Sequence, residues 1–440
     1  MLAWFSVLWV ATVGLVNSKE LPSNYHQLRG HQVWQVSDGM DDVVQGLEAE
    51  GVVDVLDHSR SRRSLRIAPQ HQEYVHNLLK DNNMDYKIHI EELLSFFQEE
   101  ESAEEESRLS RRSESREQQI CTADSCPQPL TDEYMTLDQM EWYLSELTDS
   151  HPDLVDVSSI GKSVEGRDIW LVHIKAGKCR EEKEGKRGRR AKRMARRSME
   201  TKTLWIEGGL HAREWISPAV ALRLIDNFIN DCSMSETNEV YIVPMSNPDG
   251  YKYTWTTDRM WRKNRAVISN SECKGVDLNR NWDYHWGVGA SKSPCSEVYQ
   301  GLSAFSEPET QALRDAMKKV GDIDLVLSLH SYGQVLMYPW GWTADPAPDT
   351  EAMKKMGDIF AGGARERHGS TYEVVNSAGG FYYASGATDD WAKGKLNSKY
   401  VYTLELRDGG KHGFKLPSDQ ILDAGNEVWD GIKRFLNALN

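Results

Sequence analysis

Two residues three positions apart, His211 and Glu214, could ligate a metal ion together with a third residue, His330. Imidazole nitrogens and a carboxylate oxygen are ligands that Zn²⁺ accepts, and three protein ligands leave the fourth tetrahedral position free for water, as hydrolytic zinc sites require. A His-x-x-Glu pair by itself is weak evidence, because solvated helix faces carry such pairs by chance. The surrounding sequence therefore decides between a zinc site and a polar surface.

The candidate residues follow short apolar segments in the larger part of the chain. Four segments of strand length occur there, at residues 203–206, 240–243, 325–329 and 400–404. The first precedes the pair His211 and Glu214, the third ends at His330, and the fourth ends at Glu405. From about Cys121 such strands alternate with longer helical patterns, which is typical of an α/β layered domain. Because open α/β sheets place their active sites at strand ends, we expect these side chains to meet.

The first eighteen residues form an apolar run that ends in small residues. This pattern predicts a secretory signal peptide over residues 1–18, cleaved before Lys19. No other stretch of the sequence approaches the apolar length that spans a bilayer. The sequence therefore predicts a secreted, extracellular protein that is soluble and has no membrane partner.

Residues 31–98 carry a separate pattern, in which short apolar segments flank two amphipathic stretches. We expect strands at 32–36, 52–56, 64–69 and 84–90 and helices at 41–50 and 70–82. This is the pattern of a small α+β sandwich. A charged stretch at 99–120 follows, first Glu-rich and then Arg-rich, and predicts a helical or loose connector open to proteases. The chain thus divides into residues 19–98, 99–120 and 121–440.

The charge of the chain argues against one class of partner. Its 52 basic and 67 acidic residues give a net charge of −15, which is the wrong sign for a nucleic-acid-binding protein. One segment, residues 183–197, is nevertheless a run of basic residues without periodicity. We interpret it as an exposed loop. A solvated insertion, a processing site and a patch that binds polyanions remain open for this loop.

Six cysteines in an exported chain predict disulfides rather than metal thiolates. Six cysteines allow fifteen pairings in principle. Closeness along the chain favours two of the pairs, and the remaining two cysteines give a third: Cys121 with Cys126, Cys273 with Cys295, and Cys179 with Cys232.

Seven separated motifs, in the right order, closely resemble those of the zinc metallocarboxypeptidases of the pancreatic A/B type. They are Gly209–Pro218, Asn247–Tyr251, Met260–Lys263, Asp277–Trp282, Leu329–Tyr332, Tyr382–Gly386 and Glu405–Asp408. The resemblance runs from about residue 130 to 435, and residues 31–98 resemble the inhibitory propeptide of that family. It implies a catalytic domain with a twisted, mixed eight-stranded sheet flanked by helices, here with a basic insertion at about 178–200. The disulfide Cys273–Cys295 also matches one of the family.

The resemblance implies a role for each candidate residue. His211, Glu214 and His330 would bind one Zn²⁺. Glu405 would be the general base and acid, and Arg262 would stabilise the oxyanion, because a fixed positive charge meets the charge that develops on the tetrahedral intermediate. From the residues alone, Glu405 could instead be an ion-pair partner at a strand end and Arg262 a surface cation.

An exopeptidase must recognise a free C-terminal carboxylate, which a planar guanidinium binds best through paired hydrogen bonds. The resemblance implies that Arg280 does so together with Asn279, and that Tyr382 caps the bound substrate. It also implies further substrate contacts by Arg213, Ser331, Tyr332 and Phe414. For the arginine and the two aromatic residues in this set, structural packing is an equally good explanation.

Asp389 stands where A-type enzymes carry an apolar residue and B-type enzymes carry Asp. An acidic pocket floor pairs with Lys or Arg, so the resemblance implies removal of these residues from a C-terminus. Ser377, Gly341 and Ala384 are small and leave depth for a long side chain, although B-type pockets commonly have Ser in place of Gly341. A role for Asp389 as a helix cap, and A-type or mixed specificity, are the alternatives. We interpret the adjacent Asp390 as structural.

These features together predict a monomeric zymogen that a trypsin-like protease activates by cutting near Arg112 or Arg116. Its partners would be that protease and the C-termini of peptides or proteins. The alternative from another class is a catalytically silent relative that binds peptides. The presence of all three metal ligands and of the base argues against it.

Overall fold

The computed structural model describes residues 23–37, 41–57, 63–102, 133–179 and 201–439. The predicted signal peptide, the activation arginines and the basic run at 183–197 lie outside the described residues, as do Cys121 and Cys126. Those expectations stay predictions.

The N-terminal unit is a small antiparallel sheet with strand order β2-β3-β1-β4, accompanied by two helices. Its elements are η1 (Ser23–Leu28), β1 (Gln32–Val36), α1 (Asp41–Glu50), β2 (Val53–Asp57), β3 (Arg63–Ile67), η2 (Pro69–His71), α2 (Gln72–Asp81) and β4 (Tyr86–Ile90). Every predicted element is present. Strand β3 ends two residues before the predicted 69, because Pro69 opens the 3-10 turn η2 and a proline fits the first turn of a helix. Residues 93–102 are also helical.

The larger unit is built on a mixed eight-stranded sheet with strand order β11-β10-β12-β9-β7-β8-β6-β5. The central strands β12, β9, β7 and β8 are parallel, whereas β10, β6 and β5 pair antiparallel with their neighbours toward the centre. The strands are β5 (Val155–Lys162), β6 (Asp168–Ile174), β7 (Lys202–Glu207), β8 (Asn238–Val243), β9 (Leu325–Ser331), β10 (Val335–Tyr338), β11 (Glu373–Asn376) and β12 (Tyr400–Leu406). The predicted α/β fold is confirmed.

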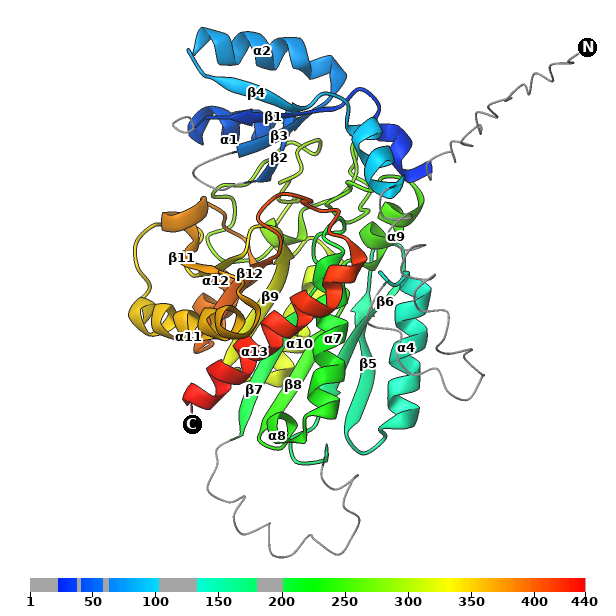
Figure 1. Ribbon diagram of the computed structural model, residues 1–440, viewed down its shortest axis with the longest axis vertical. Coiled ribbons are helices and arrows are strands. Elements are labelled where there is room, and N and C mark those ends of the chain that lie inside the picture. Colours follow the sequence, from blue (N-terminus) through cyan, green and yellow to red (C-terminus); the bar gives the residue numbers. More distant parts are fainter. Residues whose placement is uncertain (1–22, 38–40, 58–62, 103–132, 180–200, 440) are drawn as a thin grey trace, which may run out of the picture.

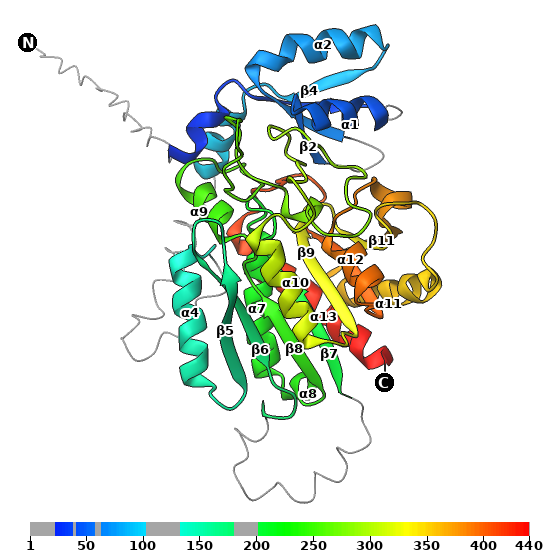
Figure 2. The ribbon, with the colours of Figure 1, turned by 180° about the vertical axis from the view of Figure 1, so that it is seen from behind.

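Helices cover both faces of this sheet. One core packs under α4, α7, α11 and α13, and a second core packs under α10 and α12; the first group lies in front in Figure 1 and α10 is in front in Figure 2. The helices are α4 (Leu137–Ser150), α7 (Ile216–Asn230), α8 (Cys232–Ser235), α9 (Pro248–Thr256), α10 (Pro308–Val320), α11 (Thr350–His368), α12 (Thr388–Lys395) and α13 (Ile421–Leu439). Short turns are η4 (Leu278–Arg280), η5 (Ser377–Phe381) and η6 (Ser418–Gln420).

Strand alternation brings the candidate residues to one face. In β9, Leu327 and Leu329 belong to the core under α7 and α13, whereas Val326 belongs to the core under α10. Because successive side chains of a strand point to opposite faces, Ser328 and His330 lie on the side of Val326.

The neighbouring strand β12 repeats the arrangement. Val401 belongs to the core under α10 and α12, so Thr403 and Glu405 point to that same side. The parallel register places Glu405 directly beside His330. The two strands therefore deliver a carboxylate and an imidazole to adjacent positions at the end of the sheet.

Two disulfides lie within the described residues, and both match the predicted pairs. Cys273 is bonded to Cys295 and Cys179 to Cys232, with Cα–Cα distances of 5.1 and 5.3 Å. Cys232 opens α8, which lies at the bottom of Figure 1, at the end of the large sheet opposite to the N-terminal unit. Cys179, which directly precedes the basic insertion, is therefore anchored far from the candidate site.

Candidate active site

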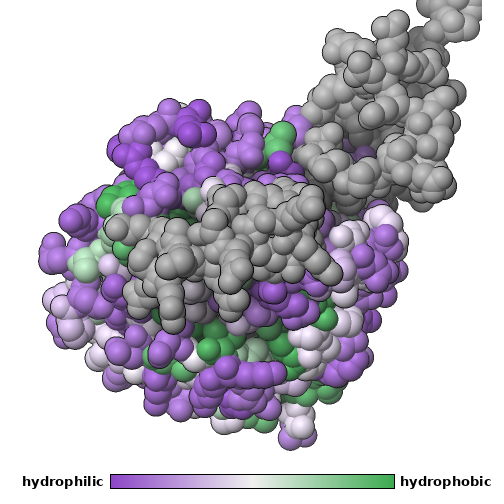
Figure 3. All heavy atoms as spheres, turned by 90° about the horizontal axis from the view of Figure 1, so that it is seen from below, coloured by the Kyte–Doolittle hydropathy of each residue, from purple (hydrophilic) through white to green (hydrophobic). Residues whose placement is uncertain are grey.

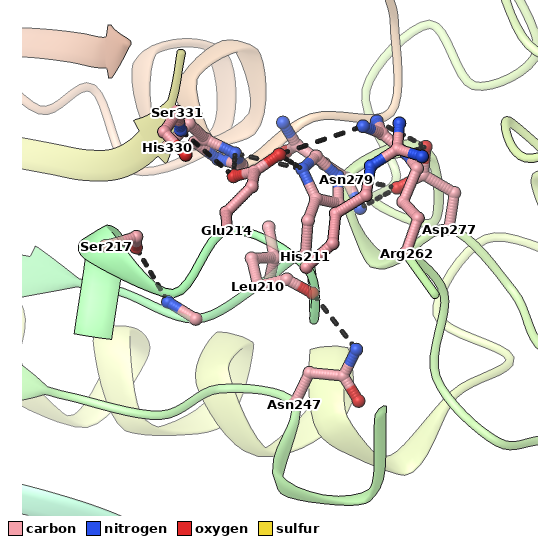
Figure 4. A network of polar contacts seen from close by, with 12 residues as sticks. Leu210, His211, Glu214, Ser217, Asn247, Arg262, Asp277, Asn279, His330 and Ser331 are labelled. Carbon is pink, nitrogen blue, oxygen red and sulfur yellow. Dashed lines mark hydrogen bonds and ion pairs between the residues drawn. The ribbon is translucent and has the colours of Figure 1, made fainter. Parts of the chain in front are cut away.

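The three predicted metal ligands converge at the end of β7 and β9 and are buried (Figure 4). Nδ1 of His211 lies 3.1 Å from Nδ1 of His330 and 2.8 Å from Oε1 of Glu214. The second carboxylate oxygen of Glu214 lies 3.1 Å from Nδ1 of His330. His211 and Glu214 come from the loop between β7 and α7, and His330 comes from β9.

This geometry fits a tetrahedral zinc ion. Zinc–nitrogen bonds of about 2.0–2.1 Å place two imidazole nitrogens of one tetrahedron roughly 3.3 Å apart, close to the 3.1 Å observed between His211 and His330. Burial by itself would raise the pKa of Glu214, but the two histidines outweigh burial and lower that pKa. The carboxylate is therefore ionised at neutral pH, as a metal ligand must be.

Each histidine is oriented through the nitrogen that faces away from the metal position. Nε2 of His211 lies 3.0 Å from Oδ1 of Asp277. Nε2 of His330 lies 3.1 Å from the hydroxyl of Ser328, which donates a hydrogen bond of 3.0 Å to Oε1 of Glu207. Because the serine proton goes to the carboxylate, the serine oxygen accepts from Nε2 of His330, and this leaves Nδ1 free to bind a metal.

Glu405 lies beside the three ligands in the same cavity. Its Oε2 is buried and has no hydrogen-bond partner among the described residues. Burial raises the pKa of Glu405 to about 8, and the negative charge of Glu214 adds to the rise. The side chain makes no ion pair with a described residue, so the alternative of a strand-end ion-pair partner has no support from the geometry.

Arg262 is held rigidly at the edge of the metal position. Its Nε and Nη2 donate hydrogen bonds of 3.2 and 2.9 Å to Oδ2 of Asp277, and its Nη1 lies 3.9 Å from Oε1 of Glu214. The side chain is buried, which contradicts the alternative of a surface cation. Arg262 therefore presents a fixed positive charge where an oxyanion could develop.

Arg280 and Asn279 share the turn η4 and face the same cavity. Arg280 donates a hydrogen bond of 2.8 Å to the main-chain oxygen of Asn279 and one of 3.4 Å to the hydroxyl of Tyr382. Nε of Arg280 is buried and has no hydrogen-bond partner in the described part of the chain. This guanidinium can therefore bind a further planar anion.

Asp389 lines the cavity from the first turn of α12 and is 4% exposed. Its Oδ2 accepts a hydrogen bond of 3.1 Å from the hydroxyl of Thr403, and its Oδ1 accepts one from the main chain of Asp390. Burial raises the pKa of Asp389. Asp390 instead accepts from the main-chain nitrogens of Gly341 and Trp342, in agreement with a structural role.

The remaining predicted contacts also lie in the cavity. These residues are Arg213, Ser331, Tyr332 and Phe414. The small residues Ser377, Gly341 and Ala384 also line the cavity. The main-chain nitrogen of Ser331 donates a hydrogen bond of 3.2 Å to Oε2 of Glu214. Two residues of the N-terminal unit, Val55 and Leu56, line the same cavity. The resemblance to an inhibitory propeptide did not indicate which of its residues reach the cavity.

Comparison with known proteins identifies the family. A model described as zinc carboxypeptidase matches residues 140–431. The chain belongs to the zinc carboxypeptidase family. Carboxypeptidase B of Astacus astacus is 38% identical over 69% of this chain and 96% of its own length, and human carboxypeptidase A1 is 31% identical over 91% of each chain. The crystal structure of carboxypeptidase A from Helicoverpa armigera has a TM-score of 0.78 at 28% identity, covering 93% of this chain and 98% of that one.

The family membership predicted from the motifs is thus confirmed, and the chain is a metallopeptidase, a hydrolase. The metal of a zinc carboxypeptidase fits the site formed by His211, Glu214 and His330. The relatives carry both A and B names at similar identity, so specificity must be argued from the pocket of this chain.

Four residues that sequence reasoning left without a role hold the site residues of this zinc carboxypeptidase in place: Asp277, Glu207, Ser328 and Thr403. Asp277 was visible in its motif, but nothing in the sequence showed which side chains it binds. Ser328 and Thr403 are polar residues inside otherwise apolar strands, two positions before His330 and Glu405. Residues two positions apart in a strand lie on the same face, so this spacing could have indicated that Ser328 and Thr403 lie beside the site residues.

We expect Ser328→Ala to weaken zinc binding by about 10- to 100-fold, the usual effect of losing the partner of a metal-ligating histidine. Without the hydroxyl, Nε2 of His330 loses its acceptor and the correct tautomer is no longer fixed. Zinc affinity is measured by competition with a chromophoric chelator. Ser235→Ala, at a buried serine of α8, is the control and keeps wild-type affinity. Equal affinity of the two variants would contradict the role of Ser328.

Proposed function

We propose that the chain is the zymogen of a secreted zinc carboxypeptidase that removes Lys or Arg from the C-terminus of peptides. The observation that carries this proposal is Asp389, a buried carboxylate in the same cavity as the three metal ligands. A long cationic side chain is a favourable partner for such a carboxylate, because a positive charge beside it offsets the cost of burying the ionised form.

The chemistry follows from the residues around the metal position. When bound, zinc supplies Lewis acidity, which polarises the scissile carbonyl and lowers the pKa of water. The positive charge of a bound metal would lower the pKa of Glu405 and keep it ionised. Its carboxylate takes the proton of the attacking water and passes it to the leaving amine, and the absence of a hydrogen-bond partner for Oε2 among the described residues supports this role. Arg262, held by Asp277, stabilises the negative charge on the carbonyl oxygen.

Restriction to the last residue of a chain comes from the other wall of the cavity. The guanidinium of Arg280 binds the C-terminal carboxylate together with Asn279, and Tyr382 closes over the substrate. In support, all three residues line the cavity, and the Tyr382 hydroxyl lies 3.4 Å from Nη2 of Arg280. An internal peptide bond offers no carboxylate to this guanidinium and is not cleaved.

The N-terminal unit acts as an inhibitory prosegment in this proposal. Val55 and Leu56 line the substrate cavity, so a peptide cannot enter while the unit is docked. Residues 19–98 form the prosegment, 99–120 the connector and 121–440 the enzyme. A trypsin-like protease cuts the connector near Arg112 or Arg116 and thereby releases the enzyme.

Secretion is proposed from the signal-like residues 1–18 and is supported by two disulfides, which form in oxidising compartments. Among the described helices, none has the length and apolarity needed to cross a membrane. The face shown in Figure 3 is mainly hydrophilic, with hydrophobic residues in small patches. The partners are the activating protease and the C-termini of peptides, and we expect a monomer that does not bind nucleic acid.

Trypsin treatment of the purified proprotein tests the proposal. Release of C-terminal Arg, Lys, Phe and Leu from matched peptides is measured before and after trypsin, with and without a zinc chelator. We expect release of Arg and Lys that appears after trypsin and disappears with the chelator. Release of Phe or Leu instead would overturn Asp389 as the selector and leave the enzyme class intact.

The docked prosegment should respond to pH through Glu48. Burial raises the pKa of this carboxyl from 4.5 to about 7, and the residue lies where α1 contacts the enzyme, since its main-chain oxygen accepts from Ser296. The docked state therefore favours the protonated form, and docking weakens as pH rises from about 4.5 through 7. The two pKa values set an upper limit of about 300-fold.

We expect the trypsin-nicked complex to release its prosegment more readily at pH 8 than at pH 5.5 on gel filtration. Glu48→Gln removes the ionisation and should abolish the difference. Glu73→Gln, at an exposed carboxylate of α2, is the control and should keep the difference. A pH dependence that persists in the Glu48 variant would contradict this prediction.

A further inference from the structure

Asp54 of the prosegment forms a bidentate ion pair with Arg213 of the enzyme. Nη1 of Arg213 donates to Oδ2 at 2.6 Å, and Nη2 donates to Oδ1 at 3.0 Å. Both side chains are buried, with 1% of Arg213 and 4% of Asp54 exposed. Parallel paired hydrogen bonds of this kind are the strongest and most selective way for a guanidinium to hold a carboxylate.

The ion pair lies in the substrate cavity. Arg213 lines the cavity that also contains His211, Glu214 and Glu405, and Val55 and Leu56, which directly follow Asp54, line it as well. A segment of the prosegment thus occupies space that a bound peptide must take. Within that segment, the carboxylate of Asp54 is the group that meets Arg213.

Loss of the prosegment would leave Arg213 without a carboxylate partner. The second ion-pair partner of Asp54 is Arg66, at 3.0 Å, and Arg66 leaves together with the prosegment. Asp54 is the only described carboxylate within ion-pair distance of Arg213. What remains is a main-chain oxygen of Met260 at 3.4 Å and the ring of Phe414, whose centroid lies 4.3 Å from Cζ of Arg213.

We propose that Arg213 forms a subsite for an acidic side chain, so that the preferred substrates carry Asp or Glu a few residues before the C-terminal residue. The inference rests on the proposed carboxypeptidase function and extends its substrate class. Asp54 is the internal occupant of this subsite in the zymogen. A guanidinium that packs on an aromatic ring has lost part of its hydration. A carboxylate compensates for this loss better than a neutral amide or carbonyl does, because hydrogen bonds between charged groups are stronger.

The test compares Asp with Asn in otherwise identical peptides, at the second, third or fourth position from the C-terminus. One series of peptides ends in Lys and a second in Phe. The full-length proprotein is activated with trypsin, and kcat/KM is then measured for each peptide. We expect Asp to be preferred over Asn by about tenfold or more at one position, the range for a charge-assisted hydrogen bond. Arg213→Met should bring the Asp/Asn ratio to about 1, and Arg213→Lys should leave an intermediate ratio.

Arg434→Met removes a positive charge from α13, where Arg434 pairs with Glu366, and should keep the wild-type Asp/Asn ratio. If the wild-type Asp/Asn ratio lay within twofold of 1 at all three positions, the proposed subsite would be wrong. It would also be wrong if Arg213→Met kept the wild-type preference for Asp. If only the Phe series is hydrolysed and Asp is preferred, the subsite stands and the basic specificity fails. If neither series is hydrolysed, both proposals fail.

Discussion

Replacing Glu405 with Gln should lower kcat by about 10²- to 10⁴-fold, the range for loss of a general base and acid. The amide keeps the shape of the side chain but cannot take a proton from water. Because Glu405 is not one of the three metal ligands, zinc content should stay at one ion per chain. The unfolding temperature should change little, since Oε2 of Glu405 makes no hydrogen bond to a described residue.

The measurement pairs kcat on a Lys-ended peptide with metal analysis of the same protein sample. Glu373→Gln is the matched control, because Glu373 is an exposed carboxylate on β11, and this variant should keep full activity and zinc. A Glu405→Gln protein that retained zinc and more than a tenth of the wild-type kcat would rule out the assigned role.

The sequence was informative for Glu405 and His330 because strand periodicity is a local property. Each residue ends an apolar segment of strand length, and such segments form the central strands of an α/β sheet. That the two strands are direct neighbours, with these two residues side by side in the register, depends on the whole sheet. Among the features of the sequence, only the resemblance to a family carries that information.

Contacts between distant segments had no such signal. Asp54 and Arg213 are 159 positions apart, and neither the strand that carries Asp54 nor the loop that carries Arg213 shows locally that the two will meet. The hydrogen bond from Ser328 to Glu207 likewise exists because β7 and β9 are adjacent, with these two residues paired in register. Side-chain networks of this kind follow from topology, which composition and spacing do not determine.

Replacing Asp389 with Ala should remove the preference for basic residues. Truncating one member of a buried charge pair costs about 2–5 kcal/mol, or roughly 30- to 4,000-fold in kcat/KM for a Lys-ended peptide, because the substrate ammonium is then buried without a partner. A Leu-ended peptide brings no charge into the pocket, so its kcat/KM should stay equal or rise. The Lys/Leu ratio therefore reports on Asp389 independently of any general loss of activity.

The adjacent Asp390 supplies the control for this prediction. Its carboxylate accepts hydrogen bonds from the main-chain nitrogens of Gly341 and Trp342, so Asp390→Asn should lower the free energy of unfolding by about 1–3 kcal/mol and leave the Lys/Leu ratio unchanged. If Asp389→Ala kept the wild-type ratio, the selecting charge would have to lie elsewhere in the cavity. If Asp390→Asn changed the ratio as strongly as Asp389→Ala, the selector would be the carboxylate pair, because the two side chains share one buried turn of α12 and their charges interact directly.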